Sequence, residues 1–131
     1  MNYEQAKQYL LSKAEAIEDY PFGPDIVVCK IRGKMFATLA EQDNIPRTNL
    51  KCDPDEALAL RDIFPSIIPG YHMNKKHWNT IILDDTIPVG EIERMMDNSY
   101  SLVVQSLPKA KRWGLESTLE ATLHTDENTK K

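Results

Sequence analysis

Apolar and polar positions follow first a helical and then a strand pattern along the chain. After Asn2, apolar side chains recur at helical spacing from Tyr3 to Ile17, and Asn2 with Gln5 is typical of a capping box. We therefore expect a first helix that ends before Asp19. Two prolines and a glycine between residues 20 and 24 then predict a loop.

Segments rich in β-branched residues predict a meander of strands. An arginine–glycine step separates segments 26–31 and 35–39 and favours a tight hairpin turn. A polar connection over residues 41–46 leads to an expected third strand at 48–52.

Two further helices have clear start and stop signals. Asp53 as a cap, Pro54 at the first helical position and Glu56 at the third predict a helix to about Phe64. Apolar residues at helical spacing predict a long helix over residues 88–107, which the next proline ends.

Between these helices, residues 69–83 predict a second hairpin with its turn at the Asn-Lys-Lys step of residues 74–76. Strand alternation places Trp78, Thr80 and Ile82 on one face. Aromatic side chains beside alternating strands are mostly core residues, so we expect Trp78 to be buried.

The order helix, three strands, helix, two strands, helix indicates an α+β fold with an antiparallel sheet and helices packed on one face. A chain of 131 residues fits one domain. We assign that domain to residues 1–115. Residues 116–131 are expected to be a C-terminal extension that is helical over 115–124 and frays from 126 onward.

The net charge of −4 hides an uneven distribution of positive charge. Residues 69–83 carry two basic and no acidic side chains, and residues 108–115 carry three and none. The apolar runs are too short to cross a bilayer, and the start lacks a signal-peptide pattern. We therefore expect a monomer in the cytoplasm with no membrane association.

Candidate reactive groups do not form a known constellation. Cys29 and Cys52 stand in separate apolar runs and are expected to be reduced, buried thiols. His72 and His77 add imidazoles without zinc-ligand spacing, so we expect no metal. A phosphate-binding glycine loop and a nucleophile elbow are also missing from the sequence, so we expect no cofactor and no enzymatic activity.

Four segments together resemble the MmcQ/YjbR family of small bacterial proteins. They are Tyr-Pro-Phe-Gly-Pro-Asp at 20–25, residues 30–37, Tyr-His-Met-Asn-Lys-Lys-His-Trp at 71–78, and residues 99–103. The resemblance spans residues 1–113 and implies a CyaY-like fold with two β-hairpin wings, described as a double-wing DNA-binding motif. It maps the first wing onto residues 26–39 and the second wing onto residues 71–83.

The resemblance and the basic segments together predict weak, largely sequence-independent DNA binding through backbone phosphates. The candidate residues are Lys30, Arg32 and Lys34 on the first wing, Lys75, Lys76 and His77 on the second, and Lys109, Lys111 and Arg112 after the last long helix. Charged hairpin tips are also common as solvated edges, and cations at a helix C-terminus complement its dipole. The alternative function is a protein-interaction module that docks a partner chain through the wings or the sheet.

Overall fold

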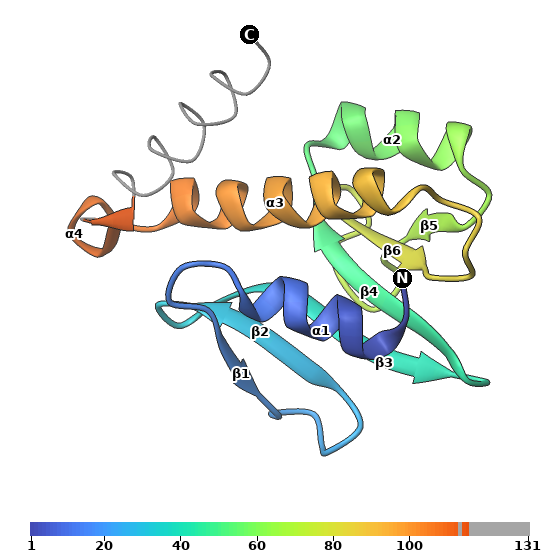
Figure 1. Ribbon diagram of the computed structural model, residues 1–131. Coiled ribbons are helices and arrows are strands. Elements are labelled where there is room, and N and C mark those ends of the chain that lie inside the picture. Colours follow the sequence, from blue (N-terminus) through green and yellow to red (C-terminus); the bar gives the residue numbers. More distant parts are fainter. Residues whose placement is uncertain (113, 116–131) are drawn as a thin grey trace, which may run out of the picture.

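The computed structural model describes residues 1–112, 114 and 115. Its strands form one antiparallel sheet in the order β1-β2-β3-β4-β6-β5 (Figure 1). The elements are α1 (Tyr3–Leu11), β1 (Ile17–Asp19), β2 (Val27–Ile31), β3 (Lys34–Gln42), β4 (Ile45–Lys51), α2 (Pro54–Ile63), β5 (Ile67–Pro69), β6 (Trp78–Ile82), α3 (Val89–Ser106) and α4 (Lys109–Arg112). The predicted α+β class is confirmed.

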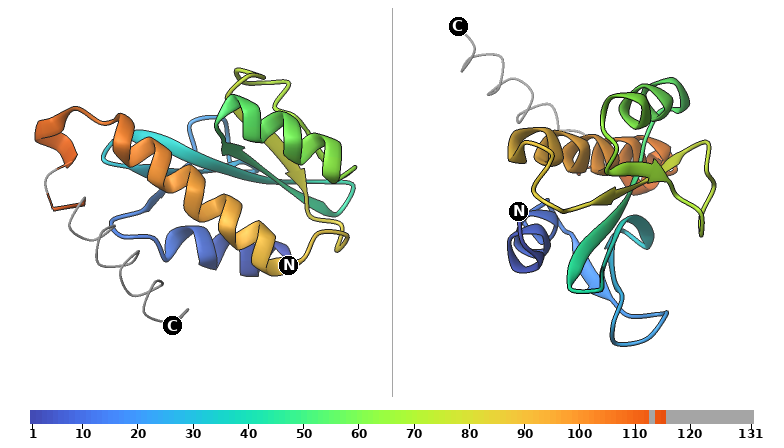
Figure 2. Two further views of the ribbon diagram at one scale, coloured as in Figure 1. Left: turned by 90° about the horizontal axis from the view of Figure 1, so that it is seen from above. Right: turned by 90° about the vertical axis from the view of Figure 1, so that its right-hand side faces the viewer.

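The three longer helices cover one face of the sheet (Figure 2). Helix α3 packs on β3 and β4, α1 on β3, and α2 on β5 and β6. Phe36, Leu50, Ile81 and Met96 are among the fully or nearly fully buried side chains between these layers. No described helix covers the opposite face between the β1–β2 loop and the β5–β6 loop, and we call it the uncovered face.

The predicted local signals form as expected. The Asn2 side chain accepts a hydrogen bond from the Gln5 backbone N–H while the Gln5 side chain accepts one from the Asn2 backbone, which completes the capping box. Asp53 caps α2 by accepting from two backbone N–H groups of its first turn. The turn between β2 and β3 has positive φ at both Arg32 (46°) and Gly33 (87°), the geometry that suits the twist of a two-residue hairpin.

The first helix is shorter than predicted. It ends at Leu11, and Ile17 belongs to β1 with 56% of its surface exposed. Glu15, in the turn between α1 and β1, has φ +59°, a left-handed conformation that a continuing helix does not contain. Strand β1 then pairs with β2, and this long-range ladder competes successfully with the local helical pattern.

The predicted polar connection over residues 41–46 is also wrong. Strand β3 continues to Gln42, and β4 begins at Ile45 after a two-residue turn. Asp43 and Asn44 both have positive φ, 55° and 65°, which these two residue types tolerate better than most.

A β-bulge opposite Cys29 and Lys30 directs β3 toward the helices. Cys29 pairs with Ala37 and Lys30 with Met35, which leaves Phe36 as the extra residue. Phe36 and Ala37 are consequently both buried, and the Phe36 ring packs edge-on against Tyr100 at 5.2 Å between centroids. The bulge leaves Met35 on the uncovered face.

The second wing is a loop over most of its length before β6. Strand β5 ends at Pro69, and the segment that follows, up to His77, is irregular. Arg61 fixes this β5–β6 loop to α2 by donating to the Lys75 carbonyl oxygen at 2.9 Å. The Asn74 side chain accepts from the Lys76 backbone N–H, so local turn chemistry replaces the predicted strand.

Three other expectations concern the ends and the thiols. Cys29 and Cys52 are free and buried, as predicted. The short helix α4 was not predicted. The helix expected over 115–124 lies outside the described residues except for residue 115, and so does the tail from 126. Within the described part of the chain, the longest helices are too short or too polar to span a membrane.

Candidate binding groove and basic surface

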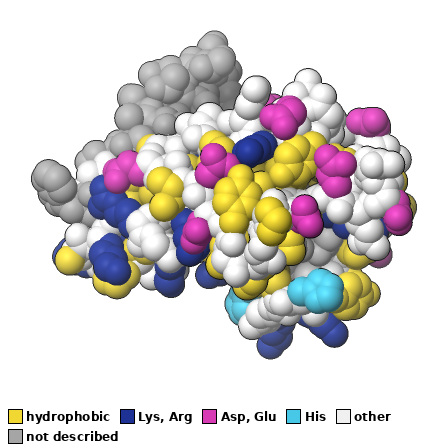
Figure 3. Space-filling model, turned by 90° about the horizontal axis from the view of Figure 1, so that it is seen from below, with side chains coloured by type: hydrophobic (Ala, Val, Ile, Leu, Met, Phe, Trp, Pro, Cys, Tyr) yellow, Lys and Arg dark blue, Asp and Glu magenta, His cyan; other side chains and the backbone are white. Residues whose placement is uncertain are grey.

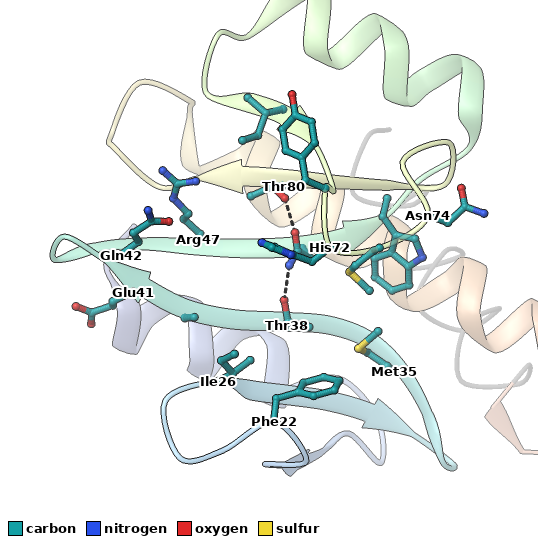
Figure 4. A pocket seen from close by; sticks show the side chains of 16 residues that line it. Phe22, Ile26, Met35, Thr38, Glu41, Gln42, Arg47, His72, Asn74 and Thr80 are labelled. Atoms are coloured by element: carbon teal, nitrogen blue, oxygen red, sulfur yellow. Dashed lines mark hydrogen bonds between the residues drawn. The ribbon is translucent and has the colours of Figure 1, made fainter.

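The uncovered face of the sheet forms a groove of about 750 Å³ (Figure 4). Alternating side chains of β3, β4 and β6 make its floor. Phe22 and Ile26 of the β1–β2 loop form one wall, and Tyr71 to Asn74 of the β5–β6 loop form the other. The groove thus lies between two loops that are far apart in the sequence, a contact that the sequence patterns did not predict.

The floor is polar, and its side chains satisfy one another. The Asn49 amide nitrogen donates to the Thr38 hydroxyl at 2.9 Å, and the Thr80 hydroxyl donates to the Asn49 amide oxygen. Thr48, on the opposite side of β4, donates to the Thr38 carbonyl oxygen at 2.8 Å. This hydrogen-bonded line across three strands needs no ligand to complete it.

Arg47 differs from the other polar residues of the groove. Its Nε atom is buried and has no hydrogen-bond partner among the described residues. In the same part of the chain Arg47 forms no ion pair, although Glu41 also lines the groove. A buried N–H without an acceptor is uncommon in folded proteins.

Aromatic side chains border this groove. Phe22 and Tyr71 are 66% and 60% exposed on opposite walls. Trp78, expected in the core, is half-buried and lines the groove together with Met35. Side chains alternate along β6 as predicted, but Asn79 and Ile81 are the ones that face the helices, so the prediction that Trp78 is buried is wrong.

Two predicted basic residues of the first wing are bound to acids. Lys30 Nζ lies 2.7 Å from an Asp19 carboxylate oxygen, and this contact holds the pKa of Asp19 below its usual range. Arg32 donates to both carboxylate oxygens of Glu15, at 3.2 and 2.7 Å, which lowers the pKa of Glu15 and raises that of Arg32. These two cations are largely compensated where they stand.

The remaining basic residues form two groups. The end of the first wing meets the C-terminal end of the described chain, because Arg32 donates to the Lys111 carbonyl oxygen at 2.8 Å and Lys34 Nζ lies 3.3 Å from the Ser106 hydroxyl. Arg112 donates to the Gln105 carbonyl oxygen at 3.4 Å. This brings the first-wing and post-helix clusters together at one end of the molecule.

The second group lies on the β5–β6 loop. Lys75 and Lys76 are exposed, and Lys75 Nζ stands 5.2 Å from the centroid of the Tyr71 ring. His77 is half-buried, and its backbone carbonyl accepts from the Cys52 N–H at 2.8 Å, so its backbone has a structural role. Within the described ranges, Lys75, Lys76, Lys109 and Lys111 form no ion pair.

The space-filling view shows how the two groups are arranged. Lysine and arginine side chains gather at the left, and a second group lies at the lower edge beside the histidines, which among the described residues belong to the β5–β6 loop (Figure 3). We call the exposed lysines of both groups, Lys34, Lys75, Lys76, Lys109 and Lys111, the basic surface. Within the described chain, the histidines, cysteines and acids form no cluster that could hold a metal ion.

The groove residues could in part have been found from sequence. Arg47 and Asn49 alternate with the buried Thr48 and Leu50, a period-two pattern that places them on the face away from the core. The partners that build the walls come from distant loops, and the sequence carries no local signal for that contact.

Comparison with known proteins supports the resemblance inferred from the motifs. The YjbR family model matches residues 11–102. The chain is 40% identical to the uncharacterized protein YbdF of Escherichia coli O157:H7 over 107 residues, covering 82% of this chain and 88% of that protein. It is 32% identical to the uncharacterized protein YjbR of Escherichia coli K12 over 112 residues, with 86% and 95% covered.

Solved structures share the fold. The crystal structure of Deinococcus radiodurans protein DR2400, which has a DUF419 domain, superposes with a TM-score of 0.78 at 34% identity over 85% of each chain. A Pseudomonas syringae protein superposes with a TM-score of 0.69 at 29% identity, covering 78% of this chain and 98% of that one. On the extent of these matches, the chain belongs to the YjbR family.

Proposed function

We propose that the protein binds DNA weakly and with little sequence preference, through contacts of the basic surface with backbone phosphates. The observation that carries this proposal is that its lysines are exposed without acidic partners in the described chain, on two groups that flank one end of the sheet. Lysine side chains are compact charges that contact phosphate better than they distinguish base edges. The proposal contains no catalytic step.

The positions of the two groups support a common binding surface. Met35, next to Lys34 in sequence, and Asn74, next to Lys75, both line the same end of the groove (Figure 4). Lys34 and Lys75 would therefore approach DNA from the same side of the molecule. Lys30 and Arg32 contribute less, because Asp19 and Glu15 compensate their charge.

The number of unpaired lysines sets the expected affinity for DNA and its dependence on salt. Lys34 is engaged with the Ser106 hydroxyl, and the other four lysines of the basic surface, Lys75, Lys76, Lys109 and Lys111, would neutralise about four phosphates and give a log–log salt slope near −3.6. That slope corresponds to roughly a hundredfold loss of affinity between 50 and 200 mM salt. The net charge of −4 opposes association, so we expect modest affinity even at low salt.

The test is a salt-dependent binding titration by fluorescence anisotropy, with labelled 20-base-pair duplexes of unrelated sequence. We expect binding at 50 mM salt, the slope given above and dissociation constants that agree between sequences within a few fold. Absence of binding at low salt, or a slope near zero, would refute the proposal.

A second candidate function is docking of a protein partner. It is favoured by the exposed apolar side chains of Phe22 and Tyr71 on the two walls of the groove and by the outer edges of β1 and β5, with which no described strand pairs. A flat salt response in the titration would favour this alternative over DNA.

A further inference from the structure

We propose that the groove on the uncovered sheet face is a binding site for a small aromatic carboxylate, with Arg47 as the residue that pairs with the carboxylate. This inference goes beyond the DNA-binding proposal, because it concerns the interior of the groove and not the lysines of the basic surface.

The first argument is the state of Arg47. Its Nε–H is removed from solvent and has no acceptor in the described chain, and a buried donor left unpaired destabilises the folded state. Arginine side chains present Nε and a terminal nitrogen as a planar fork that matches the two oxygens of a carboxylate. The Arg47 guanidinium makes no hydrogen bond or ion pair within the described residues, so a carboxylate bound at its terminal nitrogens would supply an acceptor there, and Nε joins this pair when the side chain turns toward the ligand.

The second argument is the charge of the lining. Among the described residues that line the groove, Arg47 is the one permanent cation and Glu41 the one acid. Arg47 and Glu41 form no ion pair with each other or with another described residue, so one cation is available to a ligand with a single negative charge. A phosphate dianion or a nucleic-acid strand would need more cations, and these stand outside the groove on the basic surface.

The third argument is the shape and polarity of the walls. Phe22 and Ile26 line the groove from the β1–β2 loop, and Tyr71 and Met73 line it from the β5–β6 loop. Met35 of β3 and Trp78 of β6 also line it. Flat aromatic faces and thioether or aliphatic side chains suit a planar ring. The volume of about 750 Å³ lies within the range of pockets that enclose small organic ligands.

The floor sets a further property of the ligand. Thr38, Asn49 and Thr80 use their polar groups on one another, so these strand side chains offer few free donors to a ligand. His72 of the β5–β6 loop also lines the groove. The ring part of the ligand can therefore be apolar, with its charge at the end where Arg47 lies beside Gln42 (Figure 4).

The experiment compares two nearly isosteric probes, indole-3-carboxylate and indole-3-carboxamide, by nitrogen-15 NMR titration of the full chain. We expect saturable shifts in β3, β4 and the β5–β6 loop with the carboxylate, and at least about tenfold weaker binding of the carboxamide. Arg47→Gln should remove this preference, and Arg47→Lys should keep part of it, since a lysine retains the charge but not the fork.

Arg94→Gln is the matched control, because Arg94 pairs with Glu56 and Glu91 on the helical side of the molecule. It should leave probe binding unchanged, and thermal unfolding of each variant verifies that the fold is intact. Equal binding of the two probes, unaltered preference in Arg47→Gln, or shifts confined to the helices would overturn the proposal. Tighter binding of thymidine monophosphate than of the carboxylate in the groove would also overturn it and assign the site to a phosphate ligand.

Discussion

Gly70 and Trp78 approach each other so closely that the β5–β6 loop begins with a hydrogen bond between them. The Gly70 N–H donates to the Trp78 carbonyl oxygen at 2.9 Å. A Cβ atom on residue 70 would lie 3.0 Å from the Trp78 Cβ and 3.1 Å from its carbonyl oxygen. The absence of a side chain at residue 70 therefore permits the close approach that holds one wall of the groove.

We expect Gly70→Ala to lower the free energy of unfolding by about 1–3 kcal/mol, the usual cost of forcing extra atoms into a packed site. Urea unfolding of the wild-type protein and the variant measures this difference in the free energy of unfolding. Gly90→Ala in α3 is the control, because nothing lies within 4 Å of a Cβ there. That change should be neutral or stabilising by about 0.5–1 kcal/mol. Equal effects of the two substitutions would contradict the close-approach argument.

Ser99 connects α3 to two strands. Its hydroxyl donates to the carbonyl oxygen of the bulge residue Phe36 at 2.5 Å and accepts from the Lys51 N–H at 2.8 Å, and the residue is fully buried. Ser99→Ala leaves both backbone groups without this partner and should cost about 1–3 kcal/mol. Ser101→Ala, on the more exposed part of the same helix, should change stability by less than about 0.5 kcal/mol.

Burial raises the pKa of Cys29 to about 12 and that of Cys52 to about 11. The folded-state pKa values lie above the unfolded value of 9.0, so the buried thiols favour the folded state as long as they stay protonated. Their contribution to stability is complete below pH 9 and is lost as the pH rises through the folded-state pKa values. We expect the native protein to resist a thiol-specific disulfide reagent at pH 8 and to react at both thiols in denaturant. Rapid stoichiometric labelling of the folded protein would contradict this.

Acid should destabilise the protein through its hydrogen-bonded carboxylates. The pKa of Asp84 is lowered by hydrogen bonds from the Ser66 and Thr86 hydroxyls, and the pKa of Glu15 is lowered by Arg32. A carboxyl group whose pKa is lower in the folded than in the unfolded state stabilises the native state above the unfolded pKa of about 4. This contribution to stability is lost as the pH falls through the folded-state pKa. The urea midpoint should be steady from pH 7 to 5 and fall toward pH 3. Asp84→Asn should make that decline shallower.

Local chemistry made much of the fold predictable. The capping box at Asn2, the Asp53 cap and the Arg32 turn depend on residues within a few positions of one another, and each formed as expected. Strand β1 and the length of β3 did not follow from the sequence. Their ends are decided by pairing with distant strands, which local periodicity does not encode.

The candidate site was predictable only in part for the same reason. Clusters of basic residues are visible in the sequence, but the acids that compensate Lys30 and Arg32 lie 11 and 17 positions away and meet them through the β1–β2 pairing. Alternation of side chains along β6 identifies the two faces of the strand without saying which one the helices cover, so the prediction placed Trp78 on the wrong face. The walls that make Arg47 part of a groove come from the β1–β2 and β5–β6 loops, which are far from Arg47 in the sequence.

The difference between paired and unpaired lysines gives a sharp test of the DNA proposal. Lys75 and Lys76 are exposed on the β5–β6 loop and form no ion pair in the described chain, so each can release one counterion equivalent on binding a phosphate. Lys75→Ala with Lys76→Ala should reduce the salt slope by about two units, from near −3.6 to near −1.8. Exposed loop residues contribute little to stability, so the unfolding midpoint should stay close to that of the wild-type protein.

Lys30→Ala is the matched control on the first wing. Asp19 already compensates the charge of Lys30 at 2.7 Å, so removing this lysine releases no additional counterion and uncovers a carboxylate beside the surface. The salt slope should therefore change by less than about one unit, while affinity falls slightly through the added negative charge. A change in slope for Lys30→Ala as large as that for one lysine of the β5–β6 loop would show that ion pairing in the free protein does not decide which cations contact DNA.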